Sequence, residues 1–275
     1  MKQPNIGFIG AGNMASSLIG GLLANDYPPS RIRVSDSDPG TLASTSQRFD
    51  VTGLASNGEL VEASQVVILA VKPQGLASVC REIADAVHRT QPLIISIAAG
   101  VDETAIDRWL GGTCSIIRCM PNTPALVGAG ATALHAGGRA TPEHRDWAEM
   151  IMRSVGISVW VDREELLDAV TALSGSGPAY FFLLMETMCA AAVKLGLDAD
   201  TARLLTQQTA LGAARIAIES EEAPSALRVR VTSPGGTTER AVAEFERSGF
   251  GAAVERAMQA ARDRGVELSQ QLGKT

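Results

Sequence analysis

The sequence predicts an α/β domain with a doubly wound, mostly parallel sheet, followed by an all-α domain. Up to residue 162, short apolar runs alternate with helical patterns, which is typical of right-handed βαβ crossovers. Several runs, such as VVILAV and LIISIA, are continuous and β-branched, as in parallel strands that are covered on both faces. Beyond residue 162 only helical periodicity remains, so we place the domains at 1–162 and 163–275.

Each element is expected where the period of the apolar pattern changes. The strands are expected at Asn5–Ile9, Ile32–Ser35, Val66–Ala70, Leu93–Ile97, Ser115–Cys119, Ala131–His135 and Ile157–Val161. The helices include Leu76–Val87, Pro142–Ser154, Glu164–Leu173, Pro178–Leu195, Ala199–Ser220, Ser225–Val231, Thr237–Arg247 and Ala252–Leu272. The helix over 178–195 is apolar around most of its circumference and needs cover on nearly all sides. It is either a central core helix or, as we favour, part of an interface in which helices of two chains interleave.

The composition argues against several classes of protein. The chain has 275 residues, of which 45% are hydrophobic and 20% charged, a mixture that is usual for globular proteins. A formal charge of −6 without a basic run argues against nucleic acid as a partner. No secretory signal and no apolar stretch of about 18 residues is visible, so we expect a cytoplasmic protein without a membrane span. The four cysteines lack CxxC spacing and no histidine complements them, so no metal site is expected.

The stretch GFIGAGNMA, residues 7–15, predicts a dinucleotide-binding loop. It matches G-x-G-x-x-A through Gly10, Gly12 and Ala15, and it lies between a predicted strand and a predicted helix. The first glycine allows the tight turn, the second lets a pyrophosphate approach the backbone, and the alanine lets the helix pack on the strand. The pyrophosphate would lie at the positive N-terminus of the helix. The first domain is therefore expected to be a dinucleotide-binding Rossmann domain.

Asp36, just after the second predicted strand, bears on the choice between NADH and NADPH. A carboxylate there accepts hydrogen bonds from the ribose diol of NADH and repels the 2′-phosphate of NADPH. Ser35 and Ser37 flank it and would admit the phosphate if the carboxylate turned away. A third interpretation is a solvated loop aspartate that does not contact the cofactor.

Three further loops follow strand ends, the edge at which open α/β sheets bind ligands. They read AVKPQ over 70–74, SIAAG over 96–100 and RCMPNTPALVGAG over 118–130. Lys72 is a candidate to face the cleft, with a plain surface lysine as the alternative. Asn122 and Thr123 are candidates to orient the nicotinamide, with a purely structural turn as the alternative.

A second glycine-rich helix start, SPGGTT over 233–238, predicts another anion site. Gly235 and Gly236 let the backbone fold around a small anion. The N–H groups of Gly236, Thr237 and Thr238 are expected to point out of the helix start. The alternative is an ordinary helix cap, because a serine or threonine shortly before a glutamate is a common N-terminal signature.

The motifs GFIGAGNMA, AVKPQ, SIAAG, MPNTPA, SGSGPAY and SPGGTT occur in this order, and through them the chain resembles the pyrroline-5-carboxylate reductase family over residues 5–270. The resemblance implies reduction of 1-pyrroline-5-carboxylate to L-proline by NADPH or NADH, the last step of proline biosynthesis. It also implies homodimers through the C-terminal helices, often assembled into decamers. Asp36 stands where family members that prefer NADPH tend to have small hydroxyl residues, so the residues point to NADH and the family to NADPH.

By this resemblance, the cofactor binds along the first domain at Ile9, Gly10, Ala11, Gly12, Asn13, Met14, Ser35, Asp36, Ser37, Asn57, Ala70, Val71, Lys72, Pro73, Ala98, Ala99, Gly100, Met120, Pro121 and Asn122. The substrate is expected between this domain and the helical domain of the partner subunit, at Ser176, Glu164, Glu221, Ser233, Gly235, Gly236, Thr237 and Thr238. The loop over 233–238 would hold its carboxylate. Thr238 would lie beside the ring nitrogen as the catalytic residue.

An imine that binds as its cation already carries the proton that the amine product needs, so no strong general acid is required. Catalysis is then mostly positioning of the imine carbon about 3–3.5 Å from the hydride donor.

Two alternative functions stay open. A β-hydroxyacid dehydrogenase would need a lysine on the helix after its glycine-rich turn, and here that helix has none before Lys194. A non-catalytic dinucleotide-binding oligomer would leave the second glycine-rich loop without a ligand.

Overall fold

The computed structural model describes residues 3–273, which form two compact units. The first unit runs to Ser176 and also includes the chain from Ala261 on, and the second unit is Gly177–Ala260. The border differs from the predicted one at 162/163. Leu167 is buried and Leu272 packs against an apolar core of the first unit, so both flanking segments belong to that unit.

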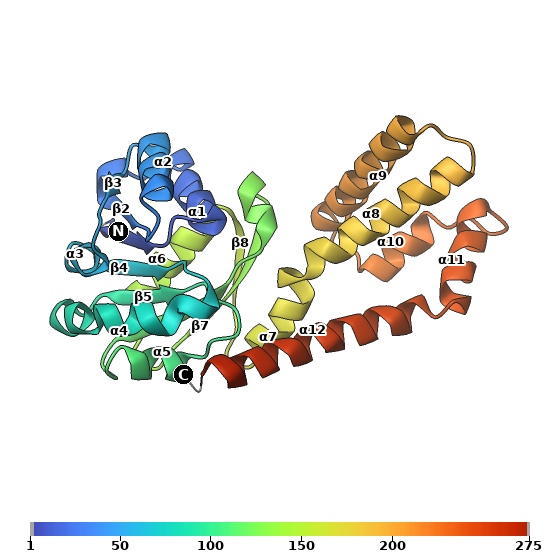
Figure 1. Ribbon diagram of the computed structural model, residues 1–275. Helices are drawn as coiled ribbons and strands as arrows, with labels where there is room; N and C mark the ends of the chain where they lie inside the picture. The colour runs from blue at the N-terminus through green and yellow to red at the C-terminus, as the bar shows by residue number, and fades with distance from the viewer. Residues whose placement is uncertain (1–2, 274–275) are drawn as a thin grey trace. The chain divides into compact units, whose positions relative to one another are not determined.

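The first unit is built on one eight-stranded sheet in the order β3-β2-β1-β4-β5-β6-β7-β8 (Figure 1). The strands are β1 (Ile6–Ile9), β2 (Ile32–Ser35), β3 (Thr52–Gly53), β4 (Val66–Leu69), β5 (Leu93–Ser96), β6 (Ser115–Met120), β7 (Gly130–Ala136) and β8 (Gly156–Trp160). All neighbours are parallel except β6 and β7. The strand order reverses between β1 and β4, which is the switch point at which doubly wound sheets bind ligands.

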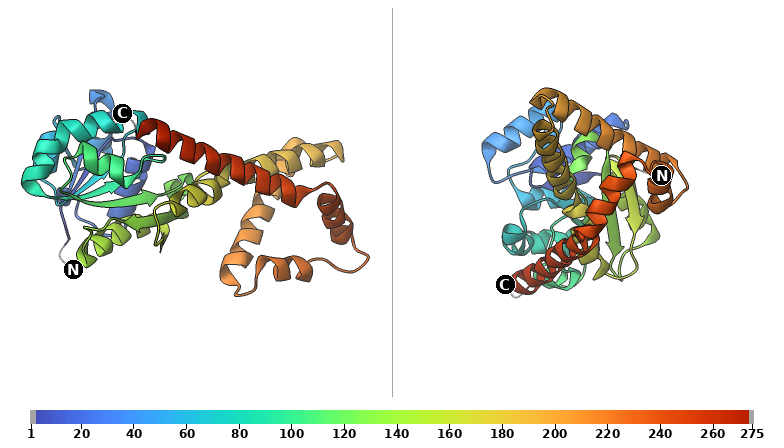
Figure 2. Two further views of the ribbon diagram at one scale, coloured as in Figure 1. Left: turned by 90° about the horizontal axis from the view of Figure 1, so that it is seen from below. Right: turned by 90° about the vertical axis from the view of Figure 1, so that its right-hand side faces the viewer.

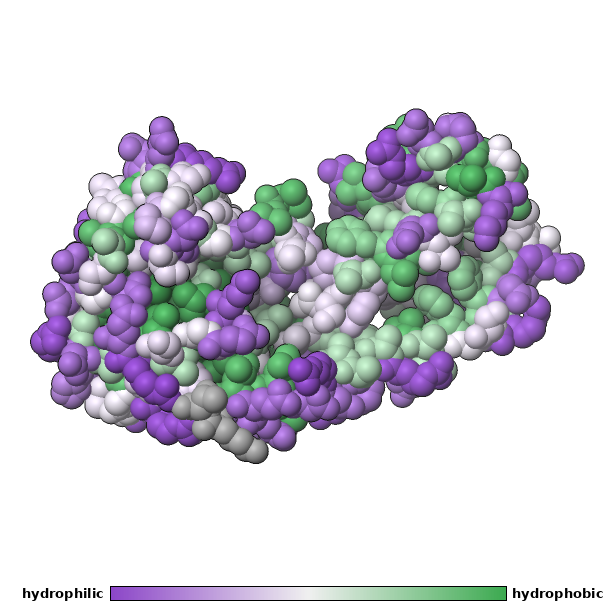
Figure 3. Space-filling model, viewed as in Figure 1, coloured by the Kyte–Doolittle hydropathy of each residue, from purple (hydrophilic) through white to green (hydrophobic). Residues whose placement is uncertain are grey.

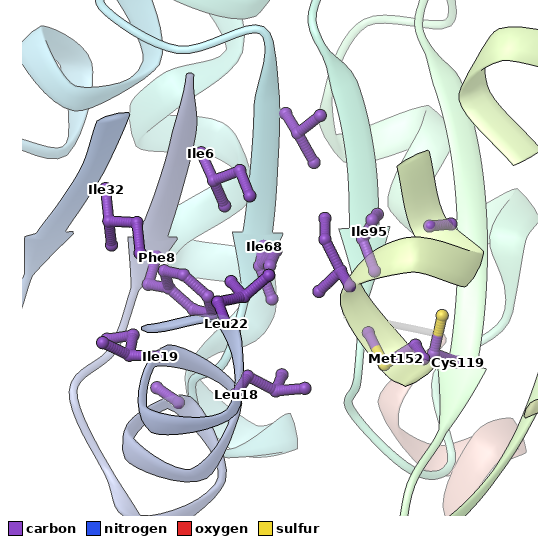
Figure 4. Close-up of a cluster of buried hydrophobic side chains, with 14 of the residues drawn as sticks. Ile6, Phe8, Leu18, Ile19, Leu22, Ile32, Ile68, Ile95, Cys119 and Met152 are labelled. Atoms are coloured by element: carbon purple, nitrogen blue, oxygen red, sulfur yellow. The ribbon is translucent and has the colours of Figure 1, made fainter. Parts of the chain in front are cut away.

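Helices cover both faces of this sheet (Figure 2). They are α1 (Asn13–Ala24), α2 (Pro39–Phe49), α3 (Asn57–Glu62), α4 (Pro73–Thr90), α5 (Glu103–Trp109), α6 (Pro142–Arg153) and α7 (Leu166–Val170). One apolar cluster joins the sheet to α1 and α6 through Phe8, Leu18 and Met152, as Figure 4 shows. A second cluster joins the opposite face to α3, α4 and α5 through Leu60, Leu76 and other side chains. Burial on both faces explains why the strands read as continuous apolar runs.

The second unit is helical, as predicted. It contains α8 (Gly177–Lys194), α9 (Ala199–Glu219), α10 (Pro224–Arg230), α11 (Thr237–Arg247) and the first part of α12 (Phe250–Leu272). Its apolar side chains are largely exposed: Phe181 is 64% exposed and Leu195 is 88% exposed. Part of this apolar surface is visible in Figure 3. Exposed apolar side chains that gather on one unit are typical of an interaction surface.

One helical stretch, Leu166–Lys194, is long and apolar enough to cross a membrane by length and composition. The sequence predicts no membrane span, because Glu186 interrupts this apolar run. The stretch comprises α7, the π-helical segment η3 (Thr171–Gly175) and α8. The composition of this helix does not distinguish between two surroundings, a lipid bilayer and another protein chain.

Candidate active site

The two glycines of the first motif meet different surroundings in the structure. Gly10 has φ +100°, and a Cβ there would lie 2.8 Å from the carbonyl oxygen of Ala70. Gly12 is the N-cap of α1, and a Cβ there would meet nothing within 4 Å. Within residues 3–273, no side chain caps this helix. Gly10 is thus required by the turn, whereas Gly12 borders open space at a helix N-terminus that suits a pyrophosphate.

Asp36 is held against the glycine-rich loop. Its Oδ2 accepts a hydrogen bond from the backbone N–H of Ala11 at 2.8 Å, and its Oδ1 accepts one from the N–H of Asp38 at 2.8 Å. These two bonds fix the carboxylate against the loop, so it is not free in solvent. The carboxylate lies where a dinucleotide ribose is expected in this fold.

The hydroxyl of the neighbouring Ser35 is not free to bind a cofactor phosphate, which was one interpretation of the sequence. Ser35 is 1% exposed and donates its hydroxyl to Asn57 Oδ1 at 2.7 Å, whereas Ser37 is exposed. Asn57 Nδ2 donates to Glu82 Oε1 at 3.1 Å and to Oε2 at 3.2 Å. Sequence reasoning missed Glu82, because an exposed glutamate in the middle of a helix gives no local signal.

The other predicted cofactor residues lie at the same edge of the sheet. The segments 70–73, 98–100 and 120–122 lie at the carboxyl ends of β4, β5 and β6, which are adjacent and parallel. Lys72 is exposed at the N-cap of α4. Gly100 has φ +69°, which strains any other residue, and a Cβ there would also lie 3.1 Å from Leu268 Cβ of α12.

The amide of Asn122 is used by the protein itself. This residue is 9% exposed, its Nδ2 donates to the carbonyl of Ser174 at 3.0 Å, and its Oδ1 accepts from the N–H of Ala131 at 2.9 Å. These bonds favour the structural alternative for its side chain. They also tie the β6 loop to η3, where a Cβ on Gly175 would lie 2.6 Å from Met120 Cε. Ser176 follows directly, and π-helical segments often mark functional sites.

Glu164 forms the centre of a partly buried charge cluster in the first unit. Its Oε1 accepts from Arg118 Nη1 at 2.7 Å and from the N–H of Glu103 at 2.6 Å. Burial raises the pKa of Glu103 and of Asp168, and the nearby Glu164 carboxylate raises both further. Glu164 thus holds the start of α5 to β6. In the second unit, Glu221 is exposed in the turn between α9 and α10.

The 233–238 loop lies in the second unit and starts α11. Gly235 has φ +73°, and its N–H donates to Glu239 Oε2 at 2.7 Å. The N–H of Gly236 donates to the carbonyl of Ser233 at 3.0 Å, so the expectation that this N–H points out of the helix is wrong. Among the described residues, the N–H groups of Thr237 and Thr238 have no such acceptor. No described side chain caps α11, which argues against the ordinary helix cap.

Among the described residues, no group of three or more histidine, cysteine, aspartate or glutamate side chains is arranged to hold a metal ion. Cys119 is fully buried, and burial raises the pKa of its thiol. It lies beside the MPN turn as a core residue.

Comparisons with known proteins match the two parts of the chain to different families. Residues 164–268 match the family described as pyrroline-5-carboxylate reductase dimerisation. Residues 5–100 match the family described as NADP oxidoreductase coenzyme F420-dependent. The pyrroline-5-carboxylate reductase of Pseudomonas aeruginosa is 50% identical over 100% of both chains, and that of Pasteurella multocida is 44% identical over 100% of this chain and 99% of the relative.

Solved structures give the same result. A pyrroline-5-carboxylate reductase from Coxiella burnetii has a TM-score of 0.93 at 45% identity, covering 98% of this chain and 99% of the other. The Plasmodium falciparum pyrroline carboxylate reductase with NADP bound has a TM-score of 0.86 at 28% identity, covering 98% and 99%. With the glycine-rich loop, the strand-end loops and the 233–238 loop in place, these full-length matches show that the chain belongs to the pyrroline-5-carboxylate reductase family.

Proposed function

We propose that this chain reduces 1-pyrroline-5-carboxylate to L-proline with hydride from NADH or NADPH, as the last step of proline biosynthesis. The observation that carries the proposal is the 50% identity to a pyrroline-5-carboxylate reductase over the full length of both chains. The lack of a lysine on α8 before Lys194 argues against a β-hydroxyacid dehydrogenase. Steady-state reduction of 1-pyrroline-5-carboxylate with each cofactor tests the proposal directly.

Residues of the first unit would bind the cofactor, and residues of the second unit would orient the substrate. The nicotinamide supplies the hydride when it is bound. Open N–H groups at Gly12 and in the first turn of α1 suit its pyrophosphate. In the second unit, the N–H groups of Thr237 and Thr238 suit the small carboxylate of the substrate. The Thr238 hydroxyl oxygen would accept a hydrogen bond from the protonated ring nitrogen. Because the imine cation arrives protonated, these residues need to orient it and not to protonate it.

The cofactor preference is proposed from Asp36. Two backbone N–H groups hold its carboxylate beside the glycine-rich loop, so it does not turn away to admit a phosphate. A carboxylate fixed there favours the ribose diol over a 2′-phosphate. We therefore propose that the chain accepts NADH well, although the Plasmodium relative was solved with NADP bound.

Replacing Asp36 with serine is expected to shift the ratio of kcat/KM for NADPH to that for NADH toward NADPH by about tenfold, or ~1.4 kcal/mol. The reason is removal of a negative charge beside the 2′-phosphate. Parallel steady-state assays with both cofactors measure the ratio. Asp36→Asn keeps the size and removes the charge, so it should move the ratio in the same direction. An unchanged ratio in both variants would show that Asp36 does not select the cofactor.

Glu164 has two possible roles, which one substitution separates. Glu164→Gln is expected to lower the free energy of unfolding by about 1–3 kcal/mol, because the largely buried Arg118 loses its counter-charge. Thermal unfolding measures this change. The adjacent Glu165→Gln is the control, since Glu165 is exposed. An unchanged melting temperature with a raised KM for the pyrroline would instead support the substrate contact that the resemblance implies.

The exposed apolar helices of the second unit support a homodimer. Phe181, Phe182 and Leu183 lie in succession on α8 and are each more than 60% exposed. The dimerisation match covers this helix, so we propose a second copy of the chain as its cover. Assembly of such dimers into a decamer is a further proposal, which the solution mass would test. We also propose a cytoplasmic location for this chain.

A further inference from the structure

We propose that Glu82 is a positioning residue for the adenosine end of the nicotinamide cofactor, acting through Asn57. The proposal rests on the function proposed above, because it takes NADH or NADPH as the ligand of the first unit. Glu82 lies on α4, the helix that begins at Pro73 in the AVKPQ motif. One helix would thus support two separate parts of the cofactor site.

The amide of Asn57 is held at both ends. Ser35 Oγ donates to its Oδ1 at 2.7 Å, and its Nδ2 donates to the two carboxylate oxygens of Glu82 at 3.1 and 3.2 Å. A carboxylate only accepts hydrogen bonds. Glu82 therefore dictates that the amide nitrogen faces α4 and that the amide oxygen faces the end of β2.

The alternative orientation of the amide is costly. If the amide flipped, its oxygen would face the Glu82 carboxylate, and its nitrogen would face the Ser35 hydroxyl. Ser35 is 1% exposed, so its hydroxyl would have little access to water as a substitute acceptor. Without Glu82, only the single bond from Ser35 orients Asn57, and the amide nitrogen no longer has a fixed partner.

The orientation of the Asn57 amide matters because the end of β2 and the Asp36 carboxylate lie beside it. Ser35 is the last residue of β2, and Asp36 follows with its carboxylate bonded to Ala11 of the glycine-rich loop. The adenosine ribose of a dinucleotide binds at this strand end. With its oxygen fixed at this strand end, Asn57 would offer the second lone pair of Oδ1 as an acceptor to the hydroxyl groups of a ribose bound there.

Glu82 itself is exposed, so its bond to Asn57 contributes little to folding. Glu82→Ala is expected to raise the Kd of NADH about three- to tenfold, the effect of one hydrogen bond. The measurement is a fluorescence titration of the full chain with NADH alone. The melting temperature and kcat at saturating NADH should stay close to wild type. Glu82→Gln keeps an acceptor for Asn57 and should restore most of the affinity.

Two controls decide whether Glu82 acts through Asn57. Asp85→Ala removes an exposed carboxylate one turn further along α4 and should leave the Kd unchanged. In an Asn57→Ala background, Glu82→Ala should have no further effect on the Kd. An unchanged Kd for Glu82→Ala, an equal effect of Asp85→Ala, or an undiminished effect without Asn57 would overturn the proposal. The titration needs no pyrroline, so a wild-type chain that binds NADH without turning over would contradict the proposed function alone.

Discussion

Gly12→Val should raise the Kd of NADH and NADPH more than about a hundredfold, because the side chain would fill the space of the pyrophosphate and remove charge-assisted hydrogen bonds worth about 1.5–3 kcal/mol each. The fold should be unaffected. A Cβ at this position meets nothing within 4 Å, and the φ of −70° is open to any residue. Cofactor titration and thermal unfolding of the same variant measure the two effects separately.

Two matched substitutions make this expectation specific. Gly10→Ala forces a side chain into φ +100° and 2.8 Å from the Ala70 carbonyl oxygen, so it should destabilise the fold by about 1–3 kcal/mol. Gly138→Val introduces the same side chain at an exposed glycine with open space around its Cβ, away from the loop. It should leave both affinity and stability unchanged. Normal NADH affinity in Gly12→Val would remove the first motif from the cofactor site.

Thr238→Ala should lower kcat/KM for 1-pyrroline-5-carboxylate by about 1–3 kcal/mol, the cost of one lost hydrogen bond to the reacting ring. The melting temperature should not change, because the structure shows no hydrogen bond from this hydroxyl among the described residues. The Kd of NADH should also stay the same, since the loop lies in the second unit. Steady-state kinetics with saturating cofactor measure the effect.

Thr238→Ser is the control for this substitution, because it keeps the hydroxyl and removes only a methyl group. It should retain most of the activity. If Thr238→Ala turned over like wild type, the hydroxyl would have no part in the reaction. If Thr238→Ser lost as much as Thr238→Ala, packing of the methyl group would explain the loss.

Much of the fold could be predicted from the sequence, because the elements that carry it have strong local patterns. The predicted strand Ile32–Ser35 and helix Thr237–Arg247 coincide with β2 and α11. Strand β3 was missed because it consists of two exposed residues, Thr52 and Gly53, that are in a strand only through their neighbours. The compact units divide at 176/177 and not at 162/163, and no local pattern shows that the end of α12 returns to the first unit.

The candidate site divides in the same way. The turn at Gly10 and the open helix start at Gly12 could be predicted, because both depend on the local backbone. The partners of Asn57, Asn122 and Glu164 could not, because each bond joins residues that are far apart in the chain. Gly236 shows the limit even within one loop. Its N–H donates to a carbonyl three residues earlier, which depends on backbone angles that the motif does not specify.

The central claim is that this chain transfers hydride from a reduced nicotinamide to the imine carbon of 1-pyrroline-5-carboxylate. The most direct measurement follows the absorbance of NADH and of NADPH in parallel, with the pyrroline present or absent, and quantifies L-proline at the end. We predict oxidation of the cofactor only when the pyrroline is present, with one proline formed for each cofactor oxidised. Cofactor binding without turnover, or brisk oxidation of 3-hydroxy acids by the oxidised cofactor, would contradict the claim.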